Sequence, residues 1–267
     1  VFWQSRQKCE HCAFLHKHCL CPRLSEVREK IVAELPRGSL QVQLAVWMHI
    51  RERYRASNTG KLLEQLLPSC EVYLCDVPED EERFEAALDR AGGRAFVLFP
   101  SEDAVPVTEA MQQLGAQASS RPDQDISPPL AVVVDGTWRQ ARRLHKRLEK
   151  LPHVALTPPA RSEFHWRRQS MEGRISTVEA AALLLEDLGE PAASIAGLRF
   201  GLQVLNKALE AQSHYHAIRP CNNKQGELEG ARRKMHRIPK KKPWEWKEEA
   251  ELAHTDAATV SSLPAED

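Results

Sequence analysis

The chain has 267 residues, of which 42% are hydrophobic and 28% charged, a composition typical of a globular protein that buries its core in one or two domains. Its 37 basic and 37 acidic side chains cancel, so the net charge does not indicate a nucleic-acid binder. No run approaches the roughly eighteen apolar residues of a membrane helix, and residues 1–9 lack a signal-peptide pattern. We therefore expect a cytoplasmic protein without membrane contact.

The first motif is the segment 9–21, CEHCAFLHKHCLC, whose cysteines follow the spacing C-x2-C-x6-C-x-C. Four thiolates so close in sequence can complete the tetrahedral shell of a structural zinc ion. Disulfides are disfavoured because nothing directs the chain to an oxidising compartment, and a catalytic thiol because clustered cysteines usually act together. We predict a zinc-binding segment over residues 1–38, with His11, His16 or His18 as alternative ligands. The predicted ligands are Cys9, Cys12, Cys19 and Cys21.

Apolar segments and helical patterns alternate along the rest of the chain. The predicted strands are 39–50, 71–77, the apolar start of 94–104, 130–135 and 153–159. The predicted helices are 24–35, a segment from Ser57 or Asn58 to Leu67, 79–93, 108–118, a segment after Gly136, 176–190 and 191–217. A capping box at Ser176 and Glu179 supports the start of one of them.

The predicted strands are mostly apolar throughout, which is typical of a mostly parallel sheet with helices on both faces. Ligands of such sheets bind at the carboxyl ends of the strands. Polar loops follow His49, Phe99 and Asp135 at those ends. We therefore expect an α/β domain over 39–218, followed by a flexible tail, first basic and then acidic, over 219–267.

Asp135 is the residue most indicative of chemistry, because it ends a buried strand in VVVDGTWRQARR. A carboxylate in this position can be desolvated and act as a base, or orient a substrate. The alternative is that Asp135 only caps the following helix. Trp138 either offers a face for stacking or packs in the core.

Basic residues continue in the same helix at spacings of three and four, so most of them share one helical face. This face is either a solvated surface or a surface that follows phosphates. The segment FHWRRQ (164–169) combines a tryptophan with arginines, a pairing suited to base stacking and phosphate contact with RNA. The RNA-binding candidates from these two segments are Arg139, Arg142, Arg143, Lys146, Trp166 and Arg167.

Five motifs follow one another along the chain: the cysteine motif, WMHIRERYRASNTGKLL, VLFPSEDA, VVVDGTWRQARRL and GRISTVEAAALLLEDL. In this combination, from about Cys9 to about Leu209, the chain resembles the DTW-domain proteins, the tRNA-uridine aminocarboxypropyltransferases. The family's D-x-T-W motif corresponds to Asp135, Thr137 and Trp138. Ile50 departs from the family, which often has proline after the histidine.

The resemblance implies a SPOUT-like fold, with a parallel sheet, helices on both sides and a C-terminal trefoil knot, a rare exception among proteins. It implies transfer of the 3-amino-3-carboxypropyl group of S-adenosylmethionine to N3 of a uridine in tRNA, which leaves methylthioadenosine. Asp135 would then be the catalytic base or hold the imide proton. We expect tRNA as the partner, no metal in the reaction, and take a monomer as the working assumption.

The loops expected to wrap the cofactor are LFPSED (98–103), DGTW (135–138) and RISTVEA (174–180). The cofactor-binding candidates are Leu98, Phe99, Pro100, Ser101, Asp135, Gly136, Thr137, Trp138, Leu156, Ile175, Ser176, Thr177 and Glu179. The loop after the first strand is expected to line the pocket or to grip the target nucleotide. Its candidates are His49, Arg51, Arg55, Asn58 and Thr59. Without the resemblance, His49 would be a strand-end histidine bonded to backbone.

Two other functions stay open on the sequence. One is a SPOUT-type RNA methyltransferase, which would use the same cofactor and surface. The other is a non-catalytic zinc-ribbon RNA-binding protein, which the cysteines and basic segments alone would suggest.

Overall fold

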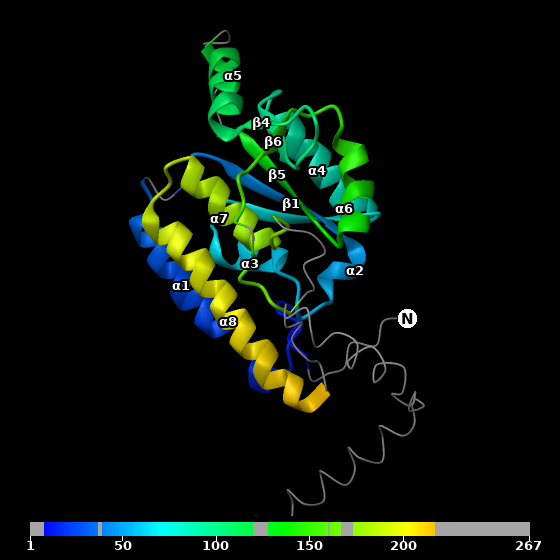
Figure 1. Ribbon diagram of the computed structural model, residues 1–267, viewed down its shortest axis with the longest axis vertical. Helices are drawn as coiled ribbons and strands as arrows, with labels where there is room; N and C mark the ends of the chain where they lie inside the picture. Colours follow the sequence, from blue (N-terminus) through cyan, green and yellow to red (C-terminus); the bar gives the residue numbers. More distant parts are fainter. Residues whose placement is uncertain (1–7, 37–38, 120–127, 160, 167–172, 217–267) are drawn as a thin grey trace, which may run out of the picture. The chain divides into compact units, whose positions relative to one another are not determined.

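The structure is a computed structural model that describes residues 8–36, 39–119, 128–159, 161–166 and 173–216 (Figure 1). The tail predicted over 219–267 lies outside these ranges. Within them, every helix is too short or too polar to cross a membrane.

A parallel sheet of six strands forms the centre of the fold. Its strands are β1 (Gln43–His49), β2 (Cys70–Cys75), β3 (Ala95–Leu98), β4 (Val105–Pro106), β5 (Leu130–Asp135) and β6 (His153–Ala155). They lie in the order β2-β1-β5-β3-β6-β4, and every neighbouring pair is parallel. The predicted α/β fold with a parallel sheet is confirmed, and the trefoil knot stays a prediction. The sequence does not predict β4, because two residues are too few to form a pattern.

Helices alternate with the strands as predicted. They are α1 (Cys21–Glu34), α2 (Ile50–Arg53), α3 (Gly60–Leu66), α4 (Pro78–Arg90), α5 (Val107–Ser119), α6 (Trp138–His145), α7 (Thr177–Asp187) and α8 (Ala192–His216), with 3-10 turns η1 (His16–His18) and η3 (Lys146–Leu148). Helix α1 begins earlier than predicted, at Cys21, because Pro22 suits the first turn of a helix. The last cysteine of the motif is therefore a helical residue.

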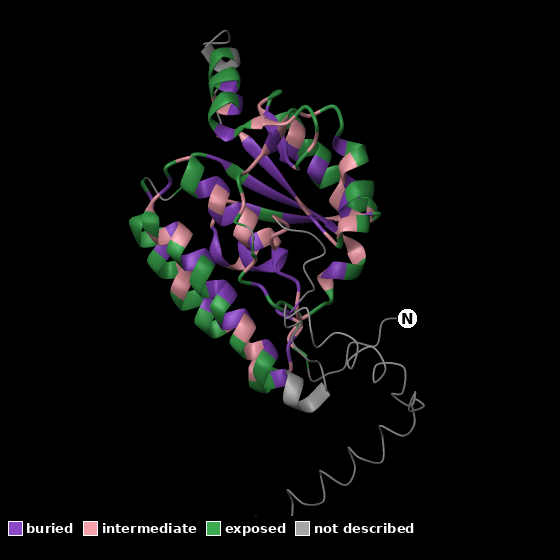
Figure 2. Cartoon of the chain, in the orientation of Figure 1, coloured by how far each residue is buried: buried purple, intermediate pink, exposed green. Residues whose placement is uncertain are grey.

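Both faces of the sheet are buried, which explains why the strands are mostly apolar throughout. On β1, Leu44, Val46 and Met48 belong to the hydrophobic cluster that includes residues of α1, α3, α7 and α8. Ala45 and Trp47 belong to the cluster on the other face, with residues of α4 and α6. Figures 1 and 2 show these two helical layers and the buried strands between them.

The N-terminal segment packs into the same core as the sheet. Phe14, Leu20 and Leu24 are buried in the cluster that α3 and α8 also join. The backbone N–H of Leu15 donates to Oε1 of Gln212 on α8, at 3.1 Å. The cysteine-rich start of the chain is therefore fixed against the rest of the described residues.

Two glycines allow α8 to lie close to α1 and α3. A Cβ at Gly197 would lie 2.4 Å from Cδ1 of Ile31, and one at Gly201 would lie 2.5 Å from Cδ1 of Leu66. Real Cβ atoms do not approach other atoms so closely. A larger residue at either position requires the neighbouring side chain or α8 itself to shift.

We predict that Gly197→Val lowers the free energy of unfolding by about 1–3 kcal/mol, because the added methyl groups overpack the contact with α1. Gly115→Val is the matched control, because a Cβ at Gly115 on α5 meets open space. The two substitutions change helix propensity equally. Urea unfolding of both variants measures the difference, and equal stabilities would contradict the close packing of α8.

Candidate catalytic cleft and cysteine cluster

A cleft lies at the carboxyl ends of β3, β5 and β6, and it holds about 840 Å³ of empty space, part of which is open to solvent. Nine of the predicted cofactor-binding residues line it: Leu98, Phe99, Pro100, Gly136, Trp138, Leu156, Ile175, Ser176 and Thr177. The cleft therefore collects segments that lie far apart in the sequence, at the edge where parallel sheets bind ligands.

The remaining walls of the cleft are mainly apolar. They come from Val133, Val134, Ala141, Val154, Pro158, Gly173 and Ala180. The sequence does not single these residues out, because apolar residues of buried strands carry no chemical signal of a ligand. Apolar walls with the hydroxyls of Ser176 and Thr177 suit a ligand that combines a ring with polar groups.

Asp135 is buried at the end of β5, with 2% of its surface exposed. Its Oδ1 accepts a hydrogen bond from Oγ1 of Thr177, and its Oδ2 accepts one from Nδ2 of Asn58, both at 2.5 Å. Thr177 is the first residue of α7, and Asn58 closely precedes α3. The N-terminal ends of two helices thus lie at the carboxylate, and their partial positive charge stabilises it.

Gly60, the first residue of α3, approaches the same carboxylate closely. A Cβ at Gly60 would lie 2.8 Å from Cγ and 2.9 Å from Oδ1 of Asp135. Any side chain at this position would displace the carboxylate, so the site requires glycine. Gly60 is not among the residues predicted from the sequence, although it lies beside two of the candidates in SNTGKLL.

The alternative that Asp135 caps helix α6 is wrong. The N-cap of α6 is Thr137, whose Oγ1 accepts a hydrogen bond from the N–H of Gln140, while the Gln140 side chain accepts one from the N–H of Thr137 at 2.7 Å. This capping box satisfies the first turn of α6. The carboxylate of Asp135 contacts α7 and the residues around the start of α3 instead.

Four of the predicted cofactor-binding residues do not line the cleft, namely Ser101, Asp135, Thr137 and Glu179. The carboxylate of Glu179 accepts hydrogen bonds from the N–H of Ser176, the hydroxyl of Ser162 and the N–H of Glu163, at 2.6 to 2.7 Å. Glu179 therefore fastens the start of α7 to the segment 161–166.

Aromatic side chains form one side of the cleft. The rings of Trp138 and Phe99 lie 6.3 Å apart, and Phe99 stacks on His145 with ring centroids 4.1 Å apart. The guanidinium carbon of Arg174 lies 4.3 Å from the centroid of Trp138, a favourable cation–π distance. A positive charge is therefore held beside a residue of the cleft lining.

His145 also contacts His153, with their Nε2 atoms 2.6 Å apart. One nitrogen must donate and the other must accept, so the bond cannot form when both rings are fully protonated. Burial, and in second place the electrostatic effect of the neighbouring His153, lowers the pKa of His145. This pair is thus most stable with at least one neutral ring.

The predicted RNA-binding residues in the loop after β1 lie partly at the surface and partly in the interior. Arg51 and Arg55 are exposed, and His49 accepts a hydrogen bond from the N–H of Arg51 at 3.2 Å. Burial lowers the pKa of His49. Asn58 and Thr59 are only 1% and 5% exposed. Their burial corrects the expectation that they face RNA, and the amide of Asn58 holds Asp135 instead.

The other RNA-binding candidates are also divided. Four are exposed on one face of α6 and the turn after it: Arg139, Arg142, Arg143 and Lys146. Trp138 and Ala141 of α6 line the cleft, so the basic face adjoins it. Trp166 is 8% exposed and belongs to the hydrophobic core, so it is not the surface stacking residue that we expected. Arg167 lies outside the described residues.

The four cysteines of the N-terminal motif converge, with the Sγ atoms of Cys9, Cys12, Cys19 and Cys21 all within 4.8 Å of one another. The Cys9–Cys21 and Cys12–Cys19 sulfur distances are 3.6 and 3.8 Å. A tetrahedral zinc site with Zn–S bonds of about 2.3 Å has sulfurs about 3.8 Å apart. Within the described residues, this group includes none of the three nearby histidines.

The electrostatics of the cluster also suit a cation. Burial and the neighbouring sulfurs raise the pKa of the Cys19 and Cys21 thiols. At Cys9, burial acts in the same direction, but hydrogen bonds from the backbone of Cys12 and His11 lower the pKa to about 6. Four thiolates can coexist in this space only when a positive ion neutralises them, so the cysteines fit a structural zinc ion.

Lys61 is a buried cation that is not among the residues predicted from the sequence. Lys61 on α3 is 2% exposed, and burial lowers its pKa to about 8. It stands among apolar residues in GKLLEQLL, and a lysine in such a short helix is more often at the surface. Only its position next to Gly60 and the candidate loop could have drawn attention to it.

Comparison with known proteins identifies similar sequences. A model of the DTW domain matches residues 6–210. A protein of Drosophila melanogaster named tRNA-uridine aminocarboxypropyltransferase 2 is 29% identical over 187 residues, 67% of this chain and 66% of that protein. The protein of the same name from Mus musculus is 28% identical over 192 residues, 69% of this chain and 57% of that protein. The chain thus matches about three fifths of the length of these relatives. No solved structure matches it.

We predict that Cys19→Ser releases most of the bound zinc and lowers the midpoint of thermal unfolding, because the cluster loses one of four ligands. Metal analysis of the purified protein and a thermal scan measure the two effects. Cys70→Ala is the control, since Cys70 is buried in β2 outside the cluster and its loss leaves the zinc in place. Full zinc content in Cys19→Ser would contradict the assignment.

We predict that the protein loses stability as the pH falls from about 7 to about 5, in part through His145. The folded protein lowers the pKa of this ring below the ordinary 6.5, so the unfolded chain binds the proton first. The stabilisation is complete above the ordinary pKa and is lost as the pH falls through the lowered one. His145→Phe keeps the stacking on Phe99 and should show a weaker pH dependence. Identical urea midpoints against pH for both proteins would contradict this.

Proposed function

The chain belongs to the DTW domain family, and we propose on that premise that it transfers the 3-amino-3-carboxypropyl group of S-adenosylmethionine to N3 of a uridine in tRNA. The names of the similar fly and mouse proteins support this reaction. The observation that carries the proposal is the buried carboxylate of Asp135 beside a cleft of suitable chemistry. Zinc has a structural role in this proposal, and tRNA is the partner.

In the proposed reaction, uridine N3 forms a bond to the carbon next to the sulfonium, and the bond from that carbon to sulfur breaks. The electron pair of the broken bond stays on sulfur, which leaves as methylthioadenosine. N3 is a weak acid and loses its proton to a base. The sulfonium supplies a good leaving group, so much of the remaining acceleration comes from positioning.

Asp135 is the proposed acceptor of the N3 proton, or the group that holds it. Its two oxygens are fixed by Asn58 and Thr177, so the carboxylate is already oriented before the substrate binds. Thr177 also lines the cleft, so its hydroxyl touches both the carboxylate and the space for the ligand. The proton therefore reaches Asp135 through this hydroxyl, which passes its own proton to the carboxylate as it takes up the proton of N3.

The cleft residues hold the donor in this proposal. Leu98, Phe99, Leu156 and Ile175 provide apolar surface for its adenine. The Ser176 hydroxyl already donates to the Glu179 carboxylate, so it can only accept a hydrogen bond from the polar groups of the donor. The exposed face of α6, with Arg139, Arg142, Arg143 and Lys146, carries the positive charge that tRNA phosphates require. Because α6 also contributes Trp138 and Ala141 to the cleft, bound tRNA would lie next to the reacting atoms.

Labelled cofactor distinguishes this reaction from methyl transfer by a related RNA methyltransferase. tRNA is incubated with the protein and with S-adenosylmethionine labelled either in the methyl group or in the aminocarboxypropyl carbons. We expect only the second label in the RNA, together with release of methylthioadenosine. Methyl label in the RNA would replace this proposal with the methyltransferase.

We predict that Asp135→Asn lowers the rate of transfer by about 10²–10⁴-fold, because the amide cannot take up the proton. The change conserves size, whereas Asp135→Ala would also leave the buried amide of Asn58 and the hydroxyl of Thr177 without their acceptor. Binding of tRNA, measured by filter binding, should stay within about twofold because Asp135 is buried away from the phosphates.

Asp89→Asn is the matched control, because Asp89 is an exposed carboxylate on α4, a helix that contributes no residue to the cleft lining. It should keep full activity. If Asp135→Asn also keeps full activity, or if the unaltered protein binds tRNA without transferring either label, the non-catalytic RNA-binding function is favoured instead.

A further inference from the structure

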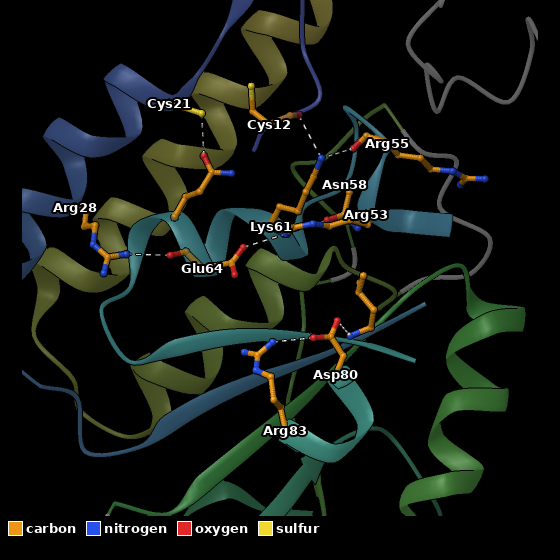
Figure 3. Close-up of polar contacts among 12 residues, drawn as sticks. Cys12, Cys21, Arg28, Arg53, Arg55, Asn58, Lys61, Glu64, Asp80 and Arg83 are labelled. Atoms are coloured by element: carbon orange, nitrogen blue, oxygen red, sulfur yellow. Dashed lines mark hydrogen bonds and ion pairs between the residues drawn. The ribbon is translucent and has the colours of Figure 1, made fainter. Parts of the chain in front are cut away.

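The ammonium group of Lys61 joins the cysteine loop to the start of α3 (Figure 3). Its Nζ donates hydrogen bonds to the backbone carbonyl of Cys12 at 3.2 Å and to that of Arg55 at 2.8 Å. Cys12 is one of the four sulfurs of the cysteine cluster. A buried ammonium is costly unless it is hydrogen-bonded, so these carbonyls are held firmly in place.

The backbone of Lys61 continues this connection toward the cleft. Its N–H donates to Oδ1 of Asn58 at 3.0 Å, and Nδ2 of the same asparagine donates to Oδ2 of Asp135. Gly60, the neighbour of Lys61, is packed directly against the carboxylate. Residues 58–61 thus contact the cysteine loop through one side chain and Asp135 through another.

The side chains of Asn58 and Lys61, which connect Asp135 with the cysteine loop, are held tightly by their contacts. Asn58 uses its oxygen for Lys61 and its nitrogen for Asp135, so a shift of α3 must move the amide that orients the carboxylate. Lys61 and Asn58 are 2% and 1% exposed, so water cannot replace their partners without opening the core. A shift of the Cys12 carbonyl would therefore change the orientation of the Asp135 carboxylate.

We propose that Lys61 is a positioning residue that couples the metal-loaded cysteine loop to Asp135. Metal bound by the four sulfurs fixes the loop and its Cys12 carbonyl, Lys61 transmits that position to α3, and Asn58 transmits it to the carboxylate. The consequence for catalysis rests on the proposed function. The structural coupling between the cluster and Asn58 does not.

The first test observes Asn58 directly. The chain has four asparagines, Asn58, Asn206, Asn222 and Asn223, so selective labelling with side-chain ¹⁵N gives a simple NMR spectrum. The Asn58 amide signal is assigned as the one that Asn58→Asp removes. Stepwise removal and return of zinc in the unaltered protein should shift this signal, while that of Asn206, on α8, stays constant. An Asn58 signal that does not respond to zinc would overturn the proposal, and no Lys61 variant is needed for this result.

The second test asks whether the coupling runs through Lys61. Lys61→Met keeps the length of the side chain and removes its donors, and Lys30→Met, exposed on α1, is the matched control. Zinc removal should shift the Asn58 amide in the control as in the unaltered protein, and much less in Lys61→Met. Retained zinc binding is checked with cadmium, whose thiolate absorption reports the cluster. A full zinc response in Lys61→Met would overturn the assignment of Lys61.

Rates give the catalytic consequence. We expect Lys61→Met to lower kcat about tenfold with little change in KM for S-adenosylmethionine, because Lys61 does not line the cleft. Zinc removal should lower kcat of the control Lys30→Met by a similar factor, and it should cause little further loss in Lys61→Met.

If zinc removal instead lowers kcat of Lys61→Met by the same factor as in the control, the two losses are independent and Lys61 is only a packing residue. If no protein in the series transfers the group, the proposed function fails, while the NMR result still decides the coupling.

Discussion

A buried carboxylate needs partners for both of its oxygens, and Asp135 finds them in segments 77 and 42 residues away along the chain. The order of the strands makes the first contact possible. Strand β1 lies next to β5, with Met48 opposite Asp135, so the loop that leaves β1 begins beside the carboxylate. Helix α7 returns to the same end of the sheet and supplies Thr177. The site therefore depends on the assembled sheet, and local structure around Asp135 would not create it.

Neighbouring residues of the DGTW motif have different structural roles, since Thr137 caps α6 and Asp135 contacts Asn58 and Thr177. Thr137 satisfies the first turn of α6 together with Gln140, so the helix start does not draw on the carboxylate of Asp135. Trp138 then contributes its ring to the cleft. Spacing the aspartate two residues before the cap thus allows one short turn to start a helix, place an aromatic wall and present a carboxylate to two other helices.

The periodic and compositional signals in the sequence predict the parallel sheet, most helix positions and the gathering of cysteines, because these depend on local pattern. The resemblance to the DTW-domain proteins indicates most of the cleft, including residues 175–177, which follow no predicted strand. The expectations fail for three residues that packing buries. Trp166 was assigned to an RNA surface because arginines follow it, and Asn58 and Thr59 were assigned to the nucleotide-gripping loop through the resemblance. Polar residues near a basic loop look alike in sequence, whether they face solvent or a buried charge. Lys61 and Gly60 were not predicted from the sequence. Lys61 bonds the carbonyl of Cys12 and Gly60 packs against Asp135, and both contacts join segments that lie far apart in the sequence.

The arginines of α6 and of the turn after it have two different roles, one at the exposed surface and one in contacts within the fold. Arg147, just beyond α6, pairs with Glu81 at 2.8 Å, bonds Sγ of Cys75 at 2.9 Å and lies over the ring of Trp47. Its guanidinium therefore holds the end of α6 against β2 and α4. The exposed arginines earlier in the helix are on the side that adjoins the cleft wall formed by Trp138 and Ala141. Exposed positive charge is therefore concentrated beside the cleft, whereas the charge of Arg147, just beyond the helix, stabilises the fold.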